Sequence, residues 1–251
     1  MQDAFVQSRA WSYLHVVLVL FSFRFFPIWL SLLADITSAS NIAFLIIDVQ
    51  NCFLSGGSLA VNEGDDVIPI INDIRCKYET QFSLVVLSQD WHCSDHISFA
   101  SQHPGSSPLQ VIQLYYGQNK TLCQLEAACD VKYSVNQTLW PDHCVINTTS
   151  ANFGGNLTRK TSDRVIRKGY NCKVDSYSAF FDNGGFEHTE LHSLLQSSGI
   201  EVVFVAGLAS DYCVYYTSVD AVNLGKFVKW IITYHKCNVN DYAYMAIYAF
   251  T

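Results

Sequence analysis

Charge is scarce in this chain of 251 residues, and it is not clustered. Charged residues make up 15% of the sequence and hydrophobic residues 50%, a composition that excludes a disordered protein. Lys and Arg number 15 against 22 Asp and Glu, so the formal net charge is −7. No block of positive charge could bind the phosphates of nucleic acid, and we expect no nucleic-acid partner. The chain also lacks repeats and linkers, and its length suits one domain with a sizeable core.

No uninterrupted apolar run reaches the ~20 residues that a membrane-spanning helix needs. Residues 11–33 are nearly all apolar, but Arg24 and Pro27 interrupt them. Small residues follow and fit the rule for signal cleavage. We therefore expect residues 1–39 to be a cleaved signal peptide of a secreted protein. An uncleaved signal anchor, the sole membrane contact of a surface-displayed protein, and a buried helix are the alternatives.

Glycosylation sequons and cysteines also favour an extracellular setting. Four sequons lie in one polar stretch, at Asn119, Asn136, Asn147 and Asn156. This stretch, about residues 103–162, has little periodicity, and we expect it to be a long glycosylated insertion; a chance Asn- and Thr-rich loop is the alternative. The nine cysteines leave eight for disulfides if one is a free reactive thiol.

Short apolar runs alternate with segments of helical spacing. The predicted strands are 42–49, 83–88, 165–167 and 202–206, and the predicted helices are 65–78, 189–198 and 212–224. Continuous apolar strands between helices predict an α/β fold with a doubly wound parallel sheet, within a domain over residues 40–232. Ligands of such sheets bind beyond the carboxyl ends of the strands.

Residues that could carry out nucleophilic chemistry stand at those ends. Asp48 and Lys168 each follow a predicted strand, and Cys213 opens a predicted helix. The positive end of a helix lowers the pKa of a thiol, which favours a nucleophilic Cys213, although a packed core thiol is the plain alternative. Asp48 could exchange the proton of the thiol, and Lys168 could supply a nearby cation.

A second group of residues has the composition of a metal site. Asp90 and His92 follow one strand, and His143 lies far downstream. One carboxylate and two imidazoles can bind a divalent ion, zinc above all or else iron or manganese, and leave positions open for substrate. His96 is an alternative ligand.

Five blocks of the sequence carry a family resemblance between about residues 43 and 225. They are DVQNCFLSGGSLAV, SQDWHCSDHISFAS, LWPDHCV, RKGYNCKVDSYSAFFDN and GLASDYCVYYTSVDAVNLG. In this order they resemble the signature blocks of nicotinamidases, which are isochorismatase-like cysteine hydrolases. The resemblance implies a sheet of about six parallel strands and a divalent metal ion. The implied catalytic triad is Cys213, Asp48 and Lys168, and the implied metal ligands are Asp90, His92 and His143.

The implied reaction converts nicotinamide to nicotinic acid and ammonia. Phe53, Trp91 and Tyr177 are the expected aromatic contacts of the pyridine ring. Backbone N–H groups near Ala209 and Cys213 are expected to bind the oxyanion, and the family often has a cis peptide before the Ala209 position. A related small-carboxamide hydrolase and a catalytically silent secreted glycoprotein are the alternative functions.

The sequence departs from the family in its cysteines and in its tail. Cys52, Cys93 and Cys172 stand at positions that are usually acidic or proline in the family. We expect some of them to form disulfides, and Cys93–Cys172 is the first pair to test. Cys144 is expected to be an unpaired buried thiol. Residues 233–251 form an atypical tail that lacks the expected ending of the fold. We expect the apolar sheet surface left uncovered to lower stability or to promote self-association into a homo-oligomer.

Overall fold

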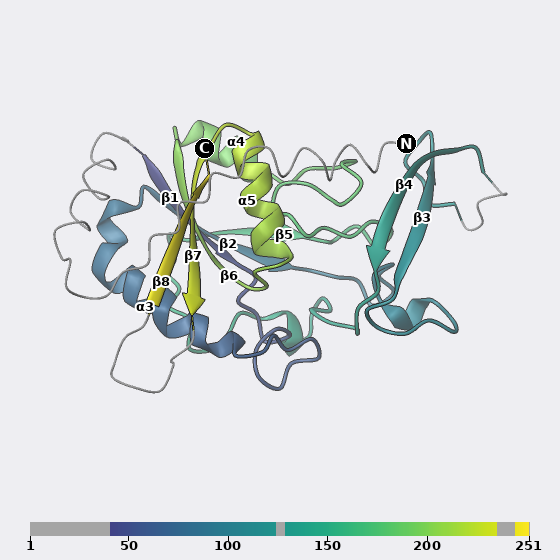
Figure 1. Cartoon of the computed structure of the whole chain (residues 1–251), viewed down its shortest axis with the longest axis horizontal. Helices are drawn as coiled ribbons and strands as arrows, with labels where there is room; N and C mark the ends of the chain where they lie inside the picture. The colour runs from purple at the N-terminus through teal and green to yellow at the C-terminus, as the bar shows by residue number, and fades with distance from the viewer. Residues whose placement is uncertain (1–40, 124–128, 235–243, 251) are drawn as a thin grey trace.

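The computed structural model describes residues 41–123, 129–234 and 244–250. The predicted signal peptide or anchor therefore lies outside the described residues. No helix within the described ranges is long and apolar enough to cross a membrane. The described residues form a six-stranded sheet with helices on both faces and a separate two-stranded sheet (Figure 1).

The six-stranded sheet confirms the predicted fold class. Its strands, in the order in which they lie in the sheet, are β5 (Arg164–Lys168), β2 (Leu84–Asp90), β1 (Ile42–Ile47), β6 (Val202–Gly207), β7 (Phe227–Tyr234) and β8 (Tyr244–Phe250). The first five strands are parallel, and β8 pairs antiparallel with β7. All six residues of β1 are buried, as expected for a central strand of a parallel sheet.

Alternate residues of β1 belong to two different cores. Phe44 and Ile46 pack in the cluster that contains α3 (Val67–Tyr78). Leu45 and Ile47 pack in the cluster that contains α4 (Leu191–Ser197) and α5 (Cys213–Asn223). Successive side chains of a strand point to opposite faces, so α3 covers one face of the sheet and α4 and α5 cover the other. The short 3-10 helices are η2 (Gly64–Asp66), η3 (Glu79–Gln81), η4 (Ala100–Gln102) and η6 (Thr149–Ala151).

The tail differs from the sequence-based expectation. Residues 244–250 add the edge strand β8 to the sheet, with Ala249 opposite Lys229. Residues 233–251 were expected to lack the ending of the fold, whereas β8 pairs with β7 along Val228–Tyr234.

The insertion also contains structure that periodicity did not reveal. β3 (Val111–Gly117) and β4 (Val131–Thr138) form an antiparallel hairpin that stands apart from the main sheet (Figure 1). Leu114 of β3 and Val135 of β4 pack in a small core that also includes Val174 of the main domain. The hairpin is thus joined to the segment that follows β5.

Three disulfides connect the loops. They are Cys52–Cys144, Cys93–Cys172 and Cys123–Cys129. The predicted Cys93–Cys172 pair is confirmed. The expectation of an unpaired Cys144 is wrong, because the Cys52 N–H donates to the Ser150 carbonyl and this contact brings the two cysteine Cα atoms within 5.4 Å.

Candidate active site

The predicted triad residues converge at the carboxyl ends of the strands. Asp48 directly follows β1, Lys168 ends β5, and Cys213 is the first residue of α5. The side chains of Asp48 and Lys168 are fully buried, and Cys213 is 7% exposed. Parallel strands end at the same edge of the sheet, which is why residues so distant in sequence meet here.

The Lys168 ammonium group is the centre of this cluster. Its Nζ lies 2.9 Å from the Asp48 carboxylate and 2.5 Å from the Asp90 carboxylate. It also donates hydrogen bonds to the Ser176 carbonyl at 2.9 Å and to the Cys213 Sγ at 3.4 Å. Burial alone would lower the pKa of Lys168, but the carboxylates of Asp48 and Asp90 raise it well above its ordinary value. The lysine therefore remains a fixed positive charge.

The surroundings of the Cys213 thiol favour its protonated form. Burial raises its pKa well above the ordinary value, and the nearby carboxylate of Asp48 adds to the rise against the opposing charge of Lys168. The net shift is therefore opposite to the lowering expected from the helix N-terminus. Burial also raises the pKa of Asp48. Reaction at the sulfur thus needs a base in place, and one carboxylate oxygen of Asp48 lies within 4.8 Å of the sulfur.

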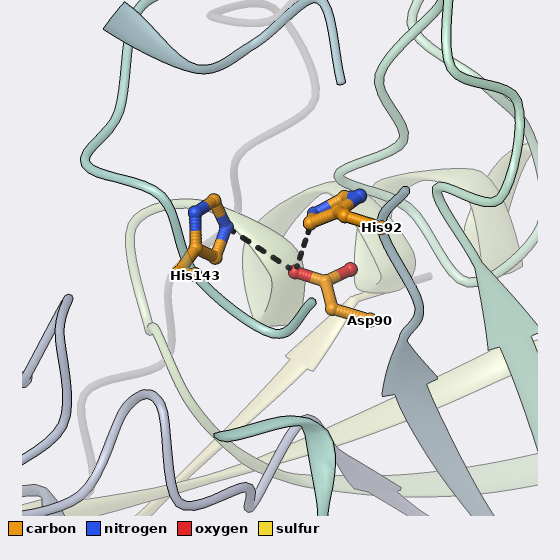
Figure 2. Close-up of side chains that lie close together, drawn as sticks. All are labelled: Asp90, His92 and His143. Carbon is orange, nitrogen blue, oxygen red and sulfur yellow. Dashed lines mark ion pairs between the residues drawn. The ribbon is translucent and has the colours of Figure 1, made fainter. Parts of the chain in front are cut away.

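A potential metal site adjoins the triad. One ligand atom from each of Asp90, His92 and His143 lies within 4.8 Å of the other two. Asp90 Oδ2 is 3.5 Å from His92 Nε2 and 3.8 Å from His143 Nε2, and Figure 2 shows both rings directed toward this carboxylate. All three side chains are buried.

Each of the two histidines contacts a backbone carbonyl through its Nδ1, which leaves its Nε2 available to a metal. His92 Nδ1 is 2.8 Å from the Gly169 carbonyl, and His143 Nδ1 is 2.8 Å from the Pro141 carbonyl. An N–H at each Nδ1 leaves the Nε2 lone pair for a metal, the usual arrangement of histidine ligands. His92 Nε2 is buried without a hydrogen-bond partner among the described residues. Burial and the neighbouring His92 lower the pKa of His143 to about 4, which keeps its ring neutral. The donor set therefore fits a divalent cation.

His96, the alternative ligand, contacts His92 but does not belong to the group of Asp90, His92 and His143. Its ring is tilted against the His92 ring with centroids 4.1 Å apart, and its Nδ1 is 2.7 Å from the Ser98 hydroxyl. His96 also belongs to a second group of ligand atoms with His92 and Asp175. Asp175 accepts a hydrogen bond at 2.9 Å from Gln137, a buried residue that the β3–β4 hairpin contributes.

Aromatic side chains surround the triad and the predicted metal site. The Phe53 ring lies 5.5 Å from the His143 ring, and the Tyr177 ring lies 5.2 Å from Tyr212, the residue before Cys213. Trp140, which the sequence analysis did not select, contacts Tyr212 with ring centroids 4.8 Å apart. The feature of the sequence that could have predicted Trp140 is its position three residues before the predicted ligand His143.

Trp91 was also predicted to contact the pyridine ring. Among the described residues, it does not belong to this aromatic cluster. Its ring instead faces the Arg167 guanidinium, whose carbon is 4.0 Å from the ring centroid. Arg167 neighbours Lys168 on β5, so its side chain points to the opposite face of the sheet.

A cis peptide bond joins Leu208 to Ala209, at the position that the family resemblance implies. The Ala209 carbonyl accepts a hydrogen bond from the Val214 N–H, which ties this peptide to the first turn of α5. The predicted oxyanion-binding residues, Ala209 and Cys213, thus lie on one turn of the chain.

All four predicted glycosylation residues lie on the surface. Asn119, Asn136, Asn147 and Asn156 are exposed, Asn136 on β4 and the other three in loops.

Comparisons with known proteins identify the family of this chain. The model of the isochorismatase domain matches residues 42–232. The chain belongs to the isochorismatase family. A nicotinamidase of Acinetobacter baylyi is 40% identical over 187 residues, which are 74% of this chain and 77% of that protein.

Solved structures of this family extend the likeness to the fold. The structure of the yeast nicotinamidase bound to the inhibitor nicotinaldehyde is 28% identical, covers 74% of this chain and 83% of its own, and has a TM-score of 0.64. The pyrazinamidase of Pyrococcus horikoshii in complex with zinc is 30% identical, covers 74% and 80% of the two chains, and has a TM-score of 0.54.

Proposed function

We propose that this isochorismatase-family protein is a nicotinamidase, a cysteine amidohydrolase that converts nicotinamide and water to nicotinic acid and ammonia. The observation that carries the proposal is the placement of one buried ammonium, that of Lys168, against the Asp48 carboxylate and the Cys213 thiol. A base, a nucleophile and a fixed cation are the parts that thiol-based amide hydrolysis needs. The nicotinamidase relatives support the choice of substrate.

In the first half of the reaction, Asp48 takes the proton of the Cys213 thiol. The thiolate attacks the carboxamide carbon, and the Lys168 ammonium stabilises the negative charge in the cluster. Backbone N–H groups near Ala209 and Cys213 bind the oxyanion, a contribution of about 3–4 kcal/mol in enzymes of this kind. Asp48 then gives its proton to the departing nitrogen, and the carbon–nitrogen bond breaks to leave ammonia and a thioester.

In the second half, Asp48 takes a proton from water, and the resulting hydroxide attacks the thioester carbon. The carbon–sulfur bond breaks, nicotinic acid leaves, and the sulfur regains a proton from Asp48. The raised pKa of Asp48 suits this work, because the carboxyl group must gain and lose a proton in each half.

Asp90, His92 and His143 would hold a divalent ion, for which we propose zinc. When bound, the ion supplies an open coordination position for a ring nitrogen of the substrate. Two imidazoles and one carboxylate suit zinc, and the zinc complex of the related pyrazinamidase supports this choice. Phe53, Tyr177 and Trp140 would contact the faces and edges of the ring.

Ammonia release from nicotinamide tests the proposal. Wild-type protein, protein treated with a chelator and the Cys213→Ala variant are compared, and only untreated wild type should turn over. Cys213→Ala should retain the metal content of the wild type, because Cys213 is not among the three proposed ligands. Benzamide, which lacks the ring nitrogen, should react far more slowly than nicotinamide. Zinc-loaded, folded wild type without activity on nicotinamide would refute the proposed function.

We also propose that the protein is a secreted glycoprotein. Three disulfides, which persist in oxidising compartments, and four exposed sequon asparagines support this setting. Expression in eukaryotic cells should release protein into the medium with a new N-terminus near residue 40. Treatment with an N-glycosidase should then shift its mass. Protein that stays with the membrane fraction would favour the uncleaved anchor.

A further inference from the structure

Each histidine of the proposed metal site is followed in the sequence by a disulfide-bonded cysteine. Cys93 follows His92 and is bonded to Cys172, and Cys144 follows His143 and is bonded to Cys52. The two bonds join positions separated by 79 and 92 residues. Both ligand loops are therefore anchored covalently to distant parts of the chain.

The segment at the far end of the Cys93–Cys172 bond also orients the His92 ring. Gly169, three residues before Cys172, places its carbonyl 2.8 Å from His92 Nδ1. The Cys172 carbonyl accepts a hydrogen bond from the Ile97 N–H at 2.9 Å, which pairs the two loops again. The disulfide therefore connects the loop of His92 to the loop that sets the direction of its ring.

The Cys52–Cys144 bond joins the loop of His143 to a segment that contacts the His143 ring. Cys52 precedes Phe53, whose ring lies 5.5 Å from the His143 ring. The Cys144 carbonyl accepts a hydrogen bond at 3.1 Å from the His92 N–H, so this loop also contacts the other histidine ligand. Both cysteines of this bond are completely buried.

A metal ion leaves its site when its ligands move apart. A cross-link next to a ligand limits this movement, because the two joined loops cannot separate by more than the bond allows. Groups that orient ligands without touching the metal typically change metal affinity by about 10–100-fold when they are removed.

We propose that the Cys93–Cys172 and Cys52–Cys144 disulfides are positioning elements of the metal site that slow the release of its bound ion. This inference depends on the metal site of the proposed function. The two bonds differ in accessibility, since Cys93 and Cys172 are partly exposed whereas Cys52 and Cys144 are buried. A mild reductant therefore reaches the first bond before the second.

The third disulfide provides a matched control. Cys123 and Cys129 are six residues apart in the connection between β3 and β4, and neither adjoins a proposed ligand. Its removal takes away one disulfide, as in the test variants, without freeing a ligand loop.

The experiment measures the rate at which zinc-loaded protein gives its metal to a chromogenic chelator in excess. Three double variants are compared with the wild type: Cys93→Ala with Cys172→Ala, Cys52→Ala with Cys144→Ala, and Cys123→Ala with Cys129→Ala. The first two should release zinc at least about tenfold faster than the wild type, and the third within about twofold of it. Release from all three at the wild-type rate, or equally fast from all three, would overturn the inference.

Two further measurements separate positioning from loss of the fold. Melting of each metal-free variant reports general stability, and the first two variants should gain less from added zinc than the control does. Limited reduction of the native wild type, with alkylated cysteines mapped by mass spectrometry, opens Cys93–Cys172 without mutation and should accelerate release equally. Unchanged release after that bond is open would contradict the proposal. Wild-type protein that binds no zinc at all would instead refute the metal site of the proposed function.

Discussion

The Lys168 ammonium and the Asp48 carboxylate form an ion pair at 2.9 Å with both side chains fully buried. Lys168 also contacts the Asp90 carboxylate, so two buried carboxylates face one buried ammonium. This cluster has an excess of one negative charge when both carboxylates are ionised. Uncompensated buried charge is costly, and a cation beside Asp90 or a proton on Asp48 would remove the excess. The cation is the alternative that leaves Asp48 ionised and able to take the thiol proton, so the electrostatics of the cluster favour the metal site.

Asp48→Asn should lower the turnover number for nicotinamide at least about 10³-fold, because the Asp48 carboxylate exchanges the proton of the Cys213 thiol in the proposed mechanism. The carboxamide has nearly the same shape, and its oxygen can still accept the hydrogen bond that Ser88 donates to Asp48. Steady-state ammonia release gives the turnover number, and elemental analysis should show an unchanged metal content. Turnover within tenfold of the wild type would exclude Asp48 as the proton carrier.

Gly169→Ala should weaken metal binding by about 10–100-fold, the effect typical of groups that orient a ligand. Gly169 has a φ of +64°, and a Cβ at this position would collide with the His92 ring. Gly185→Ala is the matched control, because Gly185 has the same φ of +64° but open space around the added methyl group. Zinc titration against a competing chelator measures both affinities. Equal affinities in the two variants would show that Gly169 does not position His92.

Sequence patterns predicted the part of the fold that is buried. Strand β1 and helix α3 carry continuous or periodic apolar residues, and their observed bounds, Ile42–Ile47 and Val67–Tyr78, lie within two residues of the predictions. Strand β4 escaped prediction because it is mostly polar and has only one face on a core. Strand β8 escaped prediction because its apolar run lies in the tail beyond the blocks that carry the family resemblance, and only the fold shows its pairing with β7.

The candidate site was predictable to the extent that residue type reveals chemistry. Cys213 and Lys168 have side chains that suit the reaction, and the structure brings them within 3.4 Å. The raised pKa of Cys213 could not be predicted, because it results from burial and from carboxylates that are distant in the sequence. Trp140 was missed for a similar reason, since only the fold brings its ring to Tyr212.

Trp140→Ala should lower kcat/KM for nicotinamide by about tenfold, mainly through a higher KM. The Trp140 ring supports Tyr212 beside the nucleophile, and loss of aromatic contacts of this kind costs about 0.5–1.5 kcal/mol. Tyr215→Ala is the control, because the Tyr215 ring is 37% exposed and contacts Tyr216 at the surface. Steady-state kinetics on both variants checks the prediction, and equal KM values would remove Trp140 from the substrate pocket.

Arg75→Met should destabilise the protein by about 3–5 kcal/mol, because it leaves the Asp163 carboxylate buried without its partner. Arg75 is 1% exposed and binds Asp163 through two hydrogen bonds of 2.6 and 2.7 Å. This ion pair joins α3 to the segment before β5, the strand that ends at Lys168. The control, Lys77→Met, removes an exposed ion pair with Asp73 and should cost at most about 1 kcal/mol. Urea unfolding at pH 7 measures both changes, and similar values would contradict the prediction.

The contribution of Glu79 to stability should disappear in acid. Hydrogen bonds from the Arg75 guanidinium lower the pKa of Glu79 below its ordinary value of 4.5. A carboxyl group whose pKa is lower in the folded state stabilises the fold at pH values above 4.5, and this stabilisation is lost as the pH falls through the folded-state pKa. The wild type should therefore be more stable than Glu79→Gln near pH 6, and the two should converge as the pH falls below 4.5 and through the folded-state pKa. Urea unfolding of both proteins across this pH range provides the measurement, and a difference that stays constant would show that the ionised carboxylate is not its source.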